Sequence, residues 1–198
     1  LGVSLYAVDF FELGPIHYSD SKPNNVATEL AKKEFEPKGN AYDDLDFLKS
    51  VLKELNVSVD SQVMVYSKTS LQKKRIFPRY PRVLYFSEST YVGYVPGGDV
   101  EVITHDPELR LVFYLISLDR VNPDKSSQEA KYGYHVTRRK DCLSCHVSSK
   151  TRDVPGLFMR SVVTDDQGEM DFKRESHFVD DETPLEDRWG GWYVTGNW

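Results

Sequence analysis

The fold class follows from the stretch RVLYFSESTYVGYV at residues 82–95. Valine, leucine, tyrosine and phenylalanine fill two short segments, residues 82–87 and 90–95, which are separated by Glu88-Ser89. Segments of this composition are typical of strands, and a connection this short makes the two strands antiparallel neighbours. The stretch therefore predicts two adjoining strands of an antiparallel sheet.

Strand-like segments continue on both sides of this stretch, at residues 62–67, 100–104 and 110–117. Turn residues separate them, with Pro-Gly-Gly-Asp at 96–99 and His-Asp-Pro at 105–107. Because these connections are short, we expect an antiparallel meander over residues 62–117 and no βαβ arrangement.

Two helices are predicted before the sheet. At residues 43–55 an apolar stripe recurs at helical spacing, and Asp43 or Asp44 supplies the N-terminal cap. The stripe consists of Leu45, Leu48, Val51, Leu52 and Leu55. A shorter helix at residues 26–34 begins after Asn25 and ends before Pro37-Lys38-Gly39. The fold class is therefore α+β, an antiparallel β meander with flanking helices.

Composition restricts the partners of the chain. The 198 residues are 39% hydrophobic and 28% charged, as expected for an ordinary globular domain. The net charge of −6 argues against a nucleic-acid partner, which requires a basic face. No apolar run is long enough to predict a membrane span.

Both cysteines lie in one motif, Cys142-Leu143-Ser144-Cys145-His146. Two thiols about one helical turn apart can each add across one vinyl group of a porphyrin, and the following imidazole then lies under the iron. The spacing predicts one covalently attached haem c, with His146 as the proximal ligand.

Three other interpretations of this cysteine pair remain open. A disulfide across so short a loop is strained and gains little entropy. A thioredoxin-like redox pair lacks a preceding buried parallel strand, and Pro155-Gly156 breaks the helix that would follow. The pair could form half of a zinc site, but the sequence has no second closely spaced Cys/His pair to complete it.

The haem motif divides the chain into three regions, which we expect to form one compact domain. They are an N-terminal arm with helices (residues 1–60), the antiparallel β region (61–121) and a c-type haem-binding region (122–198), which begins with a polar loop at 122–128. Within the last region, residues 157–164 and 169–172 flank a turn at 165–168 and predict a β-hairpin. A motif that follows more than a hundred residues of β-rich chain is not that of the all-α cytochrome c fold.

The second axial position of the iron has several candidates. We expect His177, because the segment Arg174-Glu175-Ser176-His177-Phe178 reads as a loop that can fold back over the ring. Met159 and an open position are the main alternatives. Weaker ones are Met170, His135, His105, Met64 and His17.

Basic side chains near the motif are candidates to bind the haem propionates. The favoured ones are Arg138 and Arg160, and the wider set adds Arg139, Lys140 and Arg152.

Several phrases of the sequence resemble one family. They are residues 67–72 (SKTSLQ), 81–86 (PRVLYF), 91–95 (YVGYV), 142–146 (CLSCH), 155–156 (PG), 160–162 (RSV) and 188–196 (RWGGWYVTG). The chain is similar, over roughly residues 60–196, to bacterial exported proteins described as cytochrome c domain-containing. The resemblance implies export and a single c-type haem, with no settled reaction. In the family pattern a further histidine follows Trp-Tyr-Val-Thr-Gly, whereas this sequence stops at Trp198.

These observations favour an electron carrier over a catalyst, because the haem motif has no acid/base constellation beside it. The expected function is transfer of single electrons between redox proteins in the periplasm or outside the cell. The chain could act alone, as a homo-oligomer or as a subunit of a multi-cytochrome assembly. The alternative is a haem enzyme or a sensor of peroxide or nitrogen oxide with an open iron position.

Overall fold

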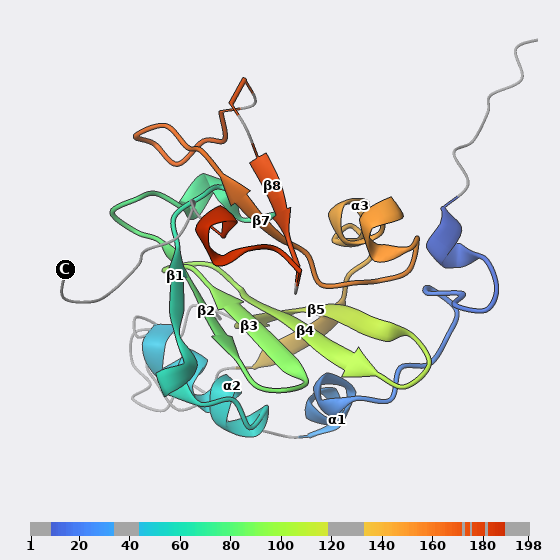
Figure 1. Cartoon of the computed structure of the whole chain (residues 1–198). Coiled ribbons are helices and arrows are strands. Elements are labelled where there is room, and N and C mark those ends of the chain that lie inside the picture. Colours follow the sequence, from blue (N-terminus) through green and yellow to red (C-terminus); the bar gives the residue numbers. More distant parts are fainter. Residues whose placement is uncertain are drawn as a thin grey trace, which may run out of the picture.

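A computed structural model describes residues 9–33, 44–118, 133–171, 173–174, 176–180 and 182–188. Its centre is a six-stranded antiparallel sheet in which every strand pairs with the next along the chain (Figure 1). The strands are β1 (Val63–Val65), β2 (Arg82–Phe86), β3 (Thr90–Tyr94), β4 (Val100–Asp106), β5 (Arg110–Leu118) and β6 (Tyr134–Arg138). The predicted α+β class and the antiparallel meander are confirmed.

The helices are short. The longer ones are α1 (Val26–Lys32) and α2 (Asp44–Glu54), followed late in the chain by the single turn α3 (Leu143–His146). The described residues also form five 3-10 turns: η1 (Phe10–Glu12), η2 (Val59–Ser61), η3 (Lys73–Arg75), η4 (Ser149–Thr151) and η5 (Leu185–Asp187). Among the described residues, no helix has the length and apolar character needed to cross a membrane.

Asn25 caps α1 as predicted. Its side-chain oxygen accepts a hydrogen bond from the Thr28 amide, and the Thr28 hydroxyl accepts one from the Asn25 amide, which is a capping box. The residues expected to end this helix (37–39), the predicted cap Asp43 and the predicted loop at 122–128 lie outside the described residues.

One face of the sheet is covered by α1 and α2, and we call it the helix-covered face (Figure 1). Its side chains follow from the register, in which Val92 pairs with Val102 and Val102 with Tyr114. All three are buried, as are Val51 and Leu52 of the predicted α2 stripe. Removing each such aliphatic side chain from water contributes about 1.5–3 kcal/mol, so this layer is the main hydrophobic core.

The opposite face, which we call the motif face, has α3 and a two-stranded ribbon over it (Figure 1). Strand alternation places Arg82, Glu101 and Phe113 on this face. The ribbon pairs β7 (Met159–Val162) with β8 (Ser176–Val179) in antiparallel register. The layers are therefore helices, sheet, and a thinner cover of α3 and ribbon.

The predicted hairpin at 157–172 is only partly correct. The turn forms, with the Gly168 amide donating to the Asp165 carbonyl at 3.1 Å, and Thr164 bridges to Met170. The strand that pairs along β7 is β8, however, because the chain turns again after Asp171, where the Arg174 amide donates to the Asp171 carbonyl at 3.1 Å. Strand β8 contributes Phe178, whose ring centroid lies 4.7 Å from that of Phe158.

The region proposed to bind haem shares the sheet with the β region. Its first described strand, β6, pairs along β5 from Leu118↔Tyr134 to Tyr114↔Arg138. The Arg139 amide extends this ladder by donating to the Phe113 carbonyl at 2.8 Å. The cysteine motif therefore begins at Cys142, four positions after the end of the edge strand β6, and follows directly from the sheet.

Candidate functional site

The motif Cys-Leu-Ser-Cys-His forms one helical turn. The amides of Cys145 and His146 both donate to the Cys142 carbonyl, at 3.2 and 3.1 Å. Leu143 is 1% exposed and anchors the turn in the core, while Ser144 and Cys145 are exposed. Since the two cysteines are three residues apart on a helix, their side chains lie on the same side of the turn.

Both thiols are free, and the chemistry of Cys142 differs from that of a redox pair. Burial raises the pKa of the Cys142 thiol to about 12, and the carboxylates of Asp141 and Glu101 act in the same direction. Redox cysteines have lowered pKa values near a helix N-terminus or a cation. Here α3 has four residues, and β6 before it is antiparallel, so the thioredoxin-like interpretation has no structural support.

The zinc interpretation also lacks its ligands in the described part of the chain. No group of three or more His, Cys, Asp or Glu side chains is arranged there to hold a metal ion. The motif offers one imidazole and two thiols on a single turn.

His146 is held in one orientation by Gly156. The imidazole Nδ1 lies 2.9 Å from the Gly156 carbonyl oxygen, and the Gly156 amide donates to the His146 carbonyl at 3.0 Å. Because a carbonyl can only accept, Nδ1 carries the proton and Nε2 keeps its lone pair. This is the tautomer that coordinates a metal through Nε2, with the second nitrogen bonded to a backbone carbonyl.

The His146 ring is enclosed. Burial lowers the pKa of the imidazole, against the opposing effect of the Gly156 carbonyl. The positive charge of Arg82 lowers this pKa further, and the negative charge of Glu101 raises it. The imidazole is neutral at neutral pH, as a metal ligand must be.

Two phenylalanine rings flank the imidazole. The Phe113 centroid lies 4.8 Å from that of His146, and the Phe158 centroid lies 6.0 Å away with the rings nearly perpendicular. Phe113 comes from the sheet and Phe158 from the approach to β7, so His146 lies between the motif face and the ribbon. These apolar walls exclude water from the nitrogen ligand.

Gly156 is required for close approach. A Cβ at this position would lie 2.7 Å from Cγ2 and 2.8 Å from Cβ of Thr151. Thr151 cannot retreat freely, because its hydroxyl bonds both the amide and the carbonyl of Ser148, at 2.9 and 3.0 Å. The loop at Pro155-Gly156 therefore needs glycine to bring its carbonyl to His146.

We expect Gly156→Ala to displace that carbonyl and free the imidazole to rotate. A protein matured with haem should then show a shifted Soret band in the absorption spectrum of its ferrous form. The control is Gly168→Ala, at a crowded glycine in the turn at 165–168, where a Cβ would lie 2.5 Å from the Tyr66 carbonyl oxygen. A band that moves equally in both variants would contradict the role given to Gly156.

The two favoured arginines lie on different layers: Arg160 is on the ribbon beside Phe178, and Arg138 is on the helix-covered face of the sheet. Arg160 shares a ribbon face with Phe178, since the two are paired in register and its guanidinium carbon lies 5.3 Å from the ring centroid. Phe158, which contacts both Phe178 and His146, lies on that same face. Arg160 therefore faces the space beside the imidazole.

Arg138 binds the N-terminal arm. It pairs with Tyr114, which places it on the helix-covered face, away from His146. Its guanidinium lies over the Tyr18 ring at 4.1 Å and donates to the carbonyls of Tyr18 and Ser21, the latter at 2.8 Å. Arg138 is close to the motif in sequence, but it lies on the other face of the sheet because alternate residues of a strand point to opposite faces.

His177 and Met159 lie on the ribbon face turned away from His146. His177 pairs with Ser161, and both alternate with Phe178 and Arg160. Ser161 is fully buried and donates to the Asp187 carbonyl at 3.3 Å, so the segment at η5 covers this face. The loop expected around His177 is strand β8, and Met159 is 45% exposed.

The other candidates are dispersed. Arg139 pairs with the Asp141 carboxylate beside the motif, at 3.0 Å from Nε to Oδ1. Lys140 and Arg152 are exposed, as is His17 in the N-terminal arm. His105 is an exposed residue of β4, and His135 is an exposed residue of the edge strand β6. Met64 lies on β1.

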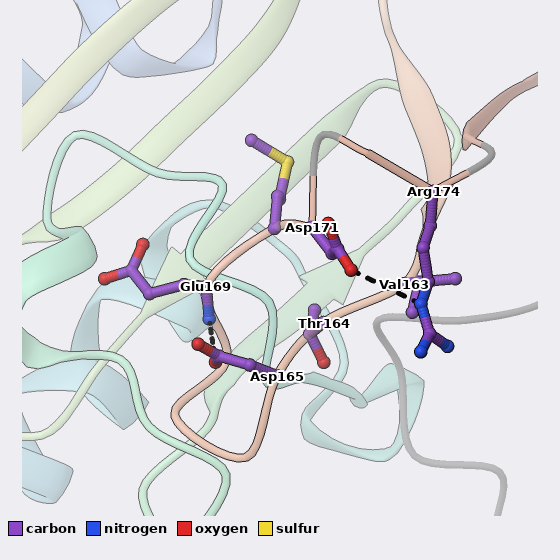
Figure 2. A pocket seen from close by; sticks show the side chains of 7 residues that line it. Val163, Thr164, Asp165, Glu169, Asp171 and Arg174 are labelled. Carbon is purple, nitrogen blue, oxygen red and sulfur yellow. Dashed lines mark hydrogen bonds and ion pairs between the residues drawn. The ribbon is translucent and has the colours of Figure 1, made fainter.

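A separate hollow of about 380 Å³ lies beyond the end of β7 (Figure 2). Asp171 and Arg174 form an ion pair at 3.3 Å there, and Asp165 accepts the Glu169 amide at 2.9 Å. The remaining lining residues are Val163, Thr164 and Met170. Met170 is the one predicted candidate in this lining, and His146 is not part of it.

Sequence reasoning missed four residues of the site: Phe113, Phe158, Gly156 and Arg82. Of these, only Gly156 could have been noticed in the sequence, because Pro155-Gly156 lies shortly after the motif and predicts a break in any helix there. Phe113 and Arg82 come from strands far away in sequence, and only the sheet register shows that they share the motif face.

Comparisons of the chain with protein-family models, with curated proteins and with solved structures find no match. The resemblance to exported cytochrome c domain-containing proteins therefore remains a prediction from the quoted phrases.

Proposed function

We propose that the chain carries one haem c, attached by thioether bonds to Cys142 and Cys145 and coordinated by Nε2 of His146. The observation that carries the proposal is the 2.9 Å contact from Nδ1 to the Gly156 carbonyl, which leaves Nε2 as the available ligand. Two free thiols on the same helical turn and apolar walls at Phe113 and Phe158 support it.

The residues present fit such a group. Each thiol adds across one vinyl group, its sulfur bonding to the carbon next to the ring and its hydrogen going to the terminal carbon, so no electron is gained or lost. The exposed Cys145 thiol is accessible for this reaction, and Cys142 lies half-buried beside it. When bound, the iron supplies one-electron chemistry between its ferric and ferrous states.

The function that follows is transfer of single electrons between redox protein partners outside the cytoplasm, in the periplasm or the extracellular space. The rigid mounting of His146 suits this role, because a ligand that barely moves between oxidation states keeps the reorganisation small. The chain acts alone or as a subunit of a larger redox assembly.

One observation favours a second function. The register puts His177 and Met159 on the far face of the ribbon, which leaves the iron without either of the two expected distal ligands. A haem with an open position binds small ligands, so the alternative is a haem enzyme or a sensor of peroxide or nitrogen oxide.

The experiment that separates the two functions is a spectrum of the reduced holoprotein with and without carbon monoxide. An unchanged spectrum supports the electron carrier, because both axial positions are then filled. A shift of the main absorption band on adding the gas overturns that conclusion and supports the ligand-binding function.

We expect His177→Ala to leave the ferric spin state and the response to carbon monoxide as in the wild type. The reason is that the His177 side chain lies on the side of the ribbon covered by the η5 segment. Met159→Ala, on the same face, is the matched control. A conversion from low-spin to high-spin in His177→Ala alone would restore His177 as the sixth ligand.

A further inference from the structure

Two arginines, one on the motif face of the sheet and one on the ribbon, each have a buried donor without a hydrogen-bond partner. The Nε atoms of Arg82 and Arg160 are both enclosed and have no hydrogen-bond partner in the described structure, as is also the case for Arg138 on the helix-covered face. Leaving a buried charged donor without an acceptor is costly, so such atoms point to a missing acceptor. Both side chains carry a full positive charge, and the acceptor that fits them is an anion.

Arg82 is fixed on the motif face. Its Nη1 donates to Oε2 of Glu101 at 3.1 Å, and the Arg82 side chain is 15% exposed. Glu101 is held in turn by Nε2 of Gln72 at 3.2 Å and by the Ser70 hydroxyl. One edge of the guanidinium is thus used by Glu101, and the Nε edge remains for a second carboxylate.

Arg160 approaches from the ribbon. Its Nη2 donates to the Ser176 hydroxyl at 2.7 Å, and its guanidinium lies over the Phe178 ring. Phe158 connects this ribbon face to His146, as described above. The two arginines therefore belong to the two layers between which the imidazole lies, Arg82 to the sheet and Arg160 to the ribbon.

We propose that Arg82 and Arg160 bind the two propionate carboxylates of the haem, one from the sheet and one from the ribbon. The assignment rests on the proposed function and adds a residue, Arg82, that lies 60 positions before Cys142 in the sequence. An arginine that binds one carboxylate with each edge of its guanidinium links Glu101 and a propionate in a row. Each guanidinium places a positive charge beside one propionate, and Arg82 shares its charge with Glu101.

The test uses holoprotein matured with haem and the variants Arg82→Gln and Arg160→Gln. Removing a positive charge next to a propionate makes the surroundings of the iron more negative, which favours the ferric state. Each variant is therefore expected to have a lower reduction potential than the wild type, measured by spectroelectrochemistry. The propionate-bending bands in resonance Raman spectra should shift as well, which loss of packing alone does not produce.

Arg79→Gln is the matched control, because Arg79 is an exposed arginine in the loop before β2. It should leave both the potential and the propionate bands unchanged. Arg82→Lys separates charge from geometry: it keeps the charge but lacks the Nε donor, so the potential should stay near that of the wild type while the propionate band shifts.

The outcomes separate this inference from the proposed function. A wild type that retains no haem after denaturation overturns the proposed function and this assignment with it. Covalent haem with unchanged potentials and propionate bands in Arg82→Gln and Arg160→Gln overturns this assignment alone, as does a potential that falls equally in Arg79→Gln. If nitrite perturbs the wild-type spectrum but not that of Arg82→Gln, the arginine binds a free oxyanion, and the propionate assignment is wrong.

Discussion

The double variant Cys142→Ser/Cys145→Ser is expected to lose all covalently bound haem. The two thiols are the only cysteines in the chain, so no other thioether can form. Denatured protein on a gel should show no haem peroxidase activity, whereas the wild type should stain strongly. The loss is complete because the covalent bond is absent, not weakened.

The single variant Cys145→Ser gives the matched intermediate case. Cys145 is exposed, so serine there removes little packing, whereas Cys142 packs against the core and is half-buried. We expect one remaining thioether and a reduced pyridine haemochrome band displaced toward that of haem with one intact vinyl group. A single variant that stains and absorbs like the wild type would contradict attachment through Cys145.

His146→Asn is expected to remove the iron ligand while keeping the turn folded. An asparagine amide can donate to the Gly156 carbonyl in place of Nδ1, but it supplies no nitrogen lone pair to the iron. The holoprotein should be produced at a small fraction of the wild-type level, and what forms should be high-spin. Circular dichroism checks that the sheet is retained.

Added imidazole provides the control for this variant. Free imidazole can supply the missing ligand, so the spectrum of His146→Asn should move toward that of a nitrogen-ligated haem as the imidazole concentration rises. In the wild type His146 already occupies the proximal position, so added imidazole should not replace it there. If His146→Asn matures normally and keeps the wild-type spectrum, another residue is the proximal ligand.

Local pattern was sufficient to predict five of the six strands of the sheet, and it did not predict β6. Alternation and turn residues fixed all five strands between residues 62 and 117, because each pairs with its immediate neighbour along the chain. Strand β8 was missed for the opposite reason. Its sequence is polar and its partner β7 is separated from it by an intervening turn, so its conformation depends on packing of Phe178 against Phe158.

The site was predictable only where the chemistry is local. The spacing of Cys142, Cys145 and His146 is a property of five consecutive residues, and the structure places them on one turn. Arg138 was favoured because it is near the motif in sequence, but strand alternation directs it to the helix-covered face. Side chains that come from separate strands, such as Arg82 and Phe113, are brought to His146 by the sheet register alone.

The most direct test of the account is the intact mass of the wild-type chain under denaturing conditions, after expression in a host that attaches haem c. Covalent attachment predicts a mass equal to the polypeptide plus one haem, and the same peptide containing residues 142–146 should carry the addition after digestion. A mass equal to the polypeptide alone, from a host that matures a control cytochrome c fully, would contradict the central claim.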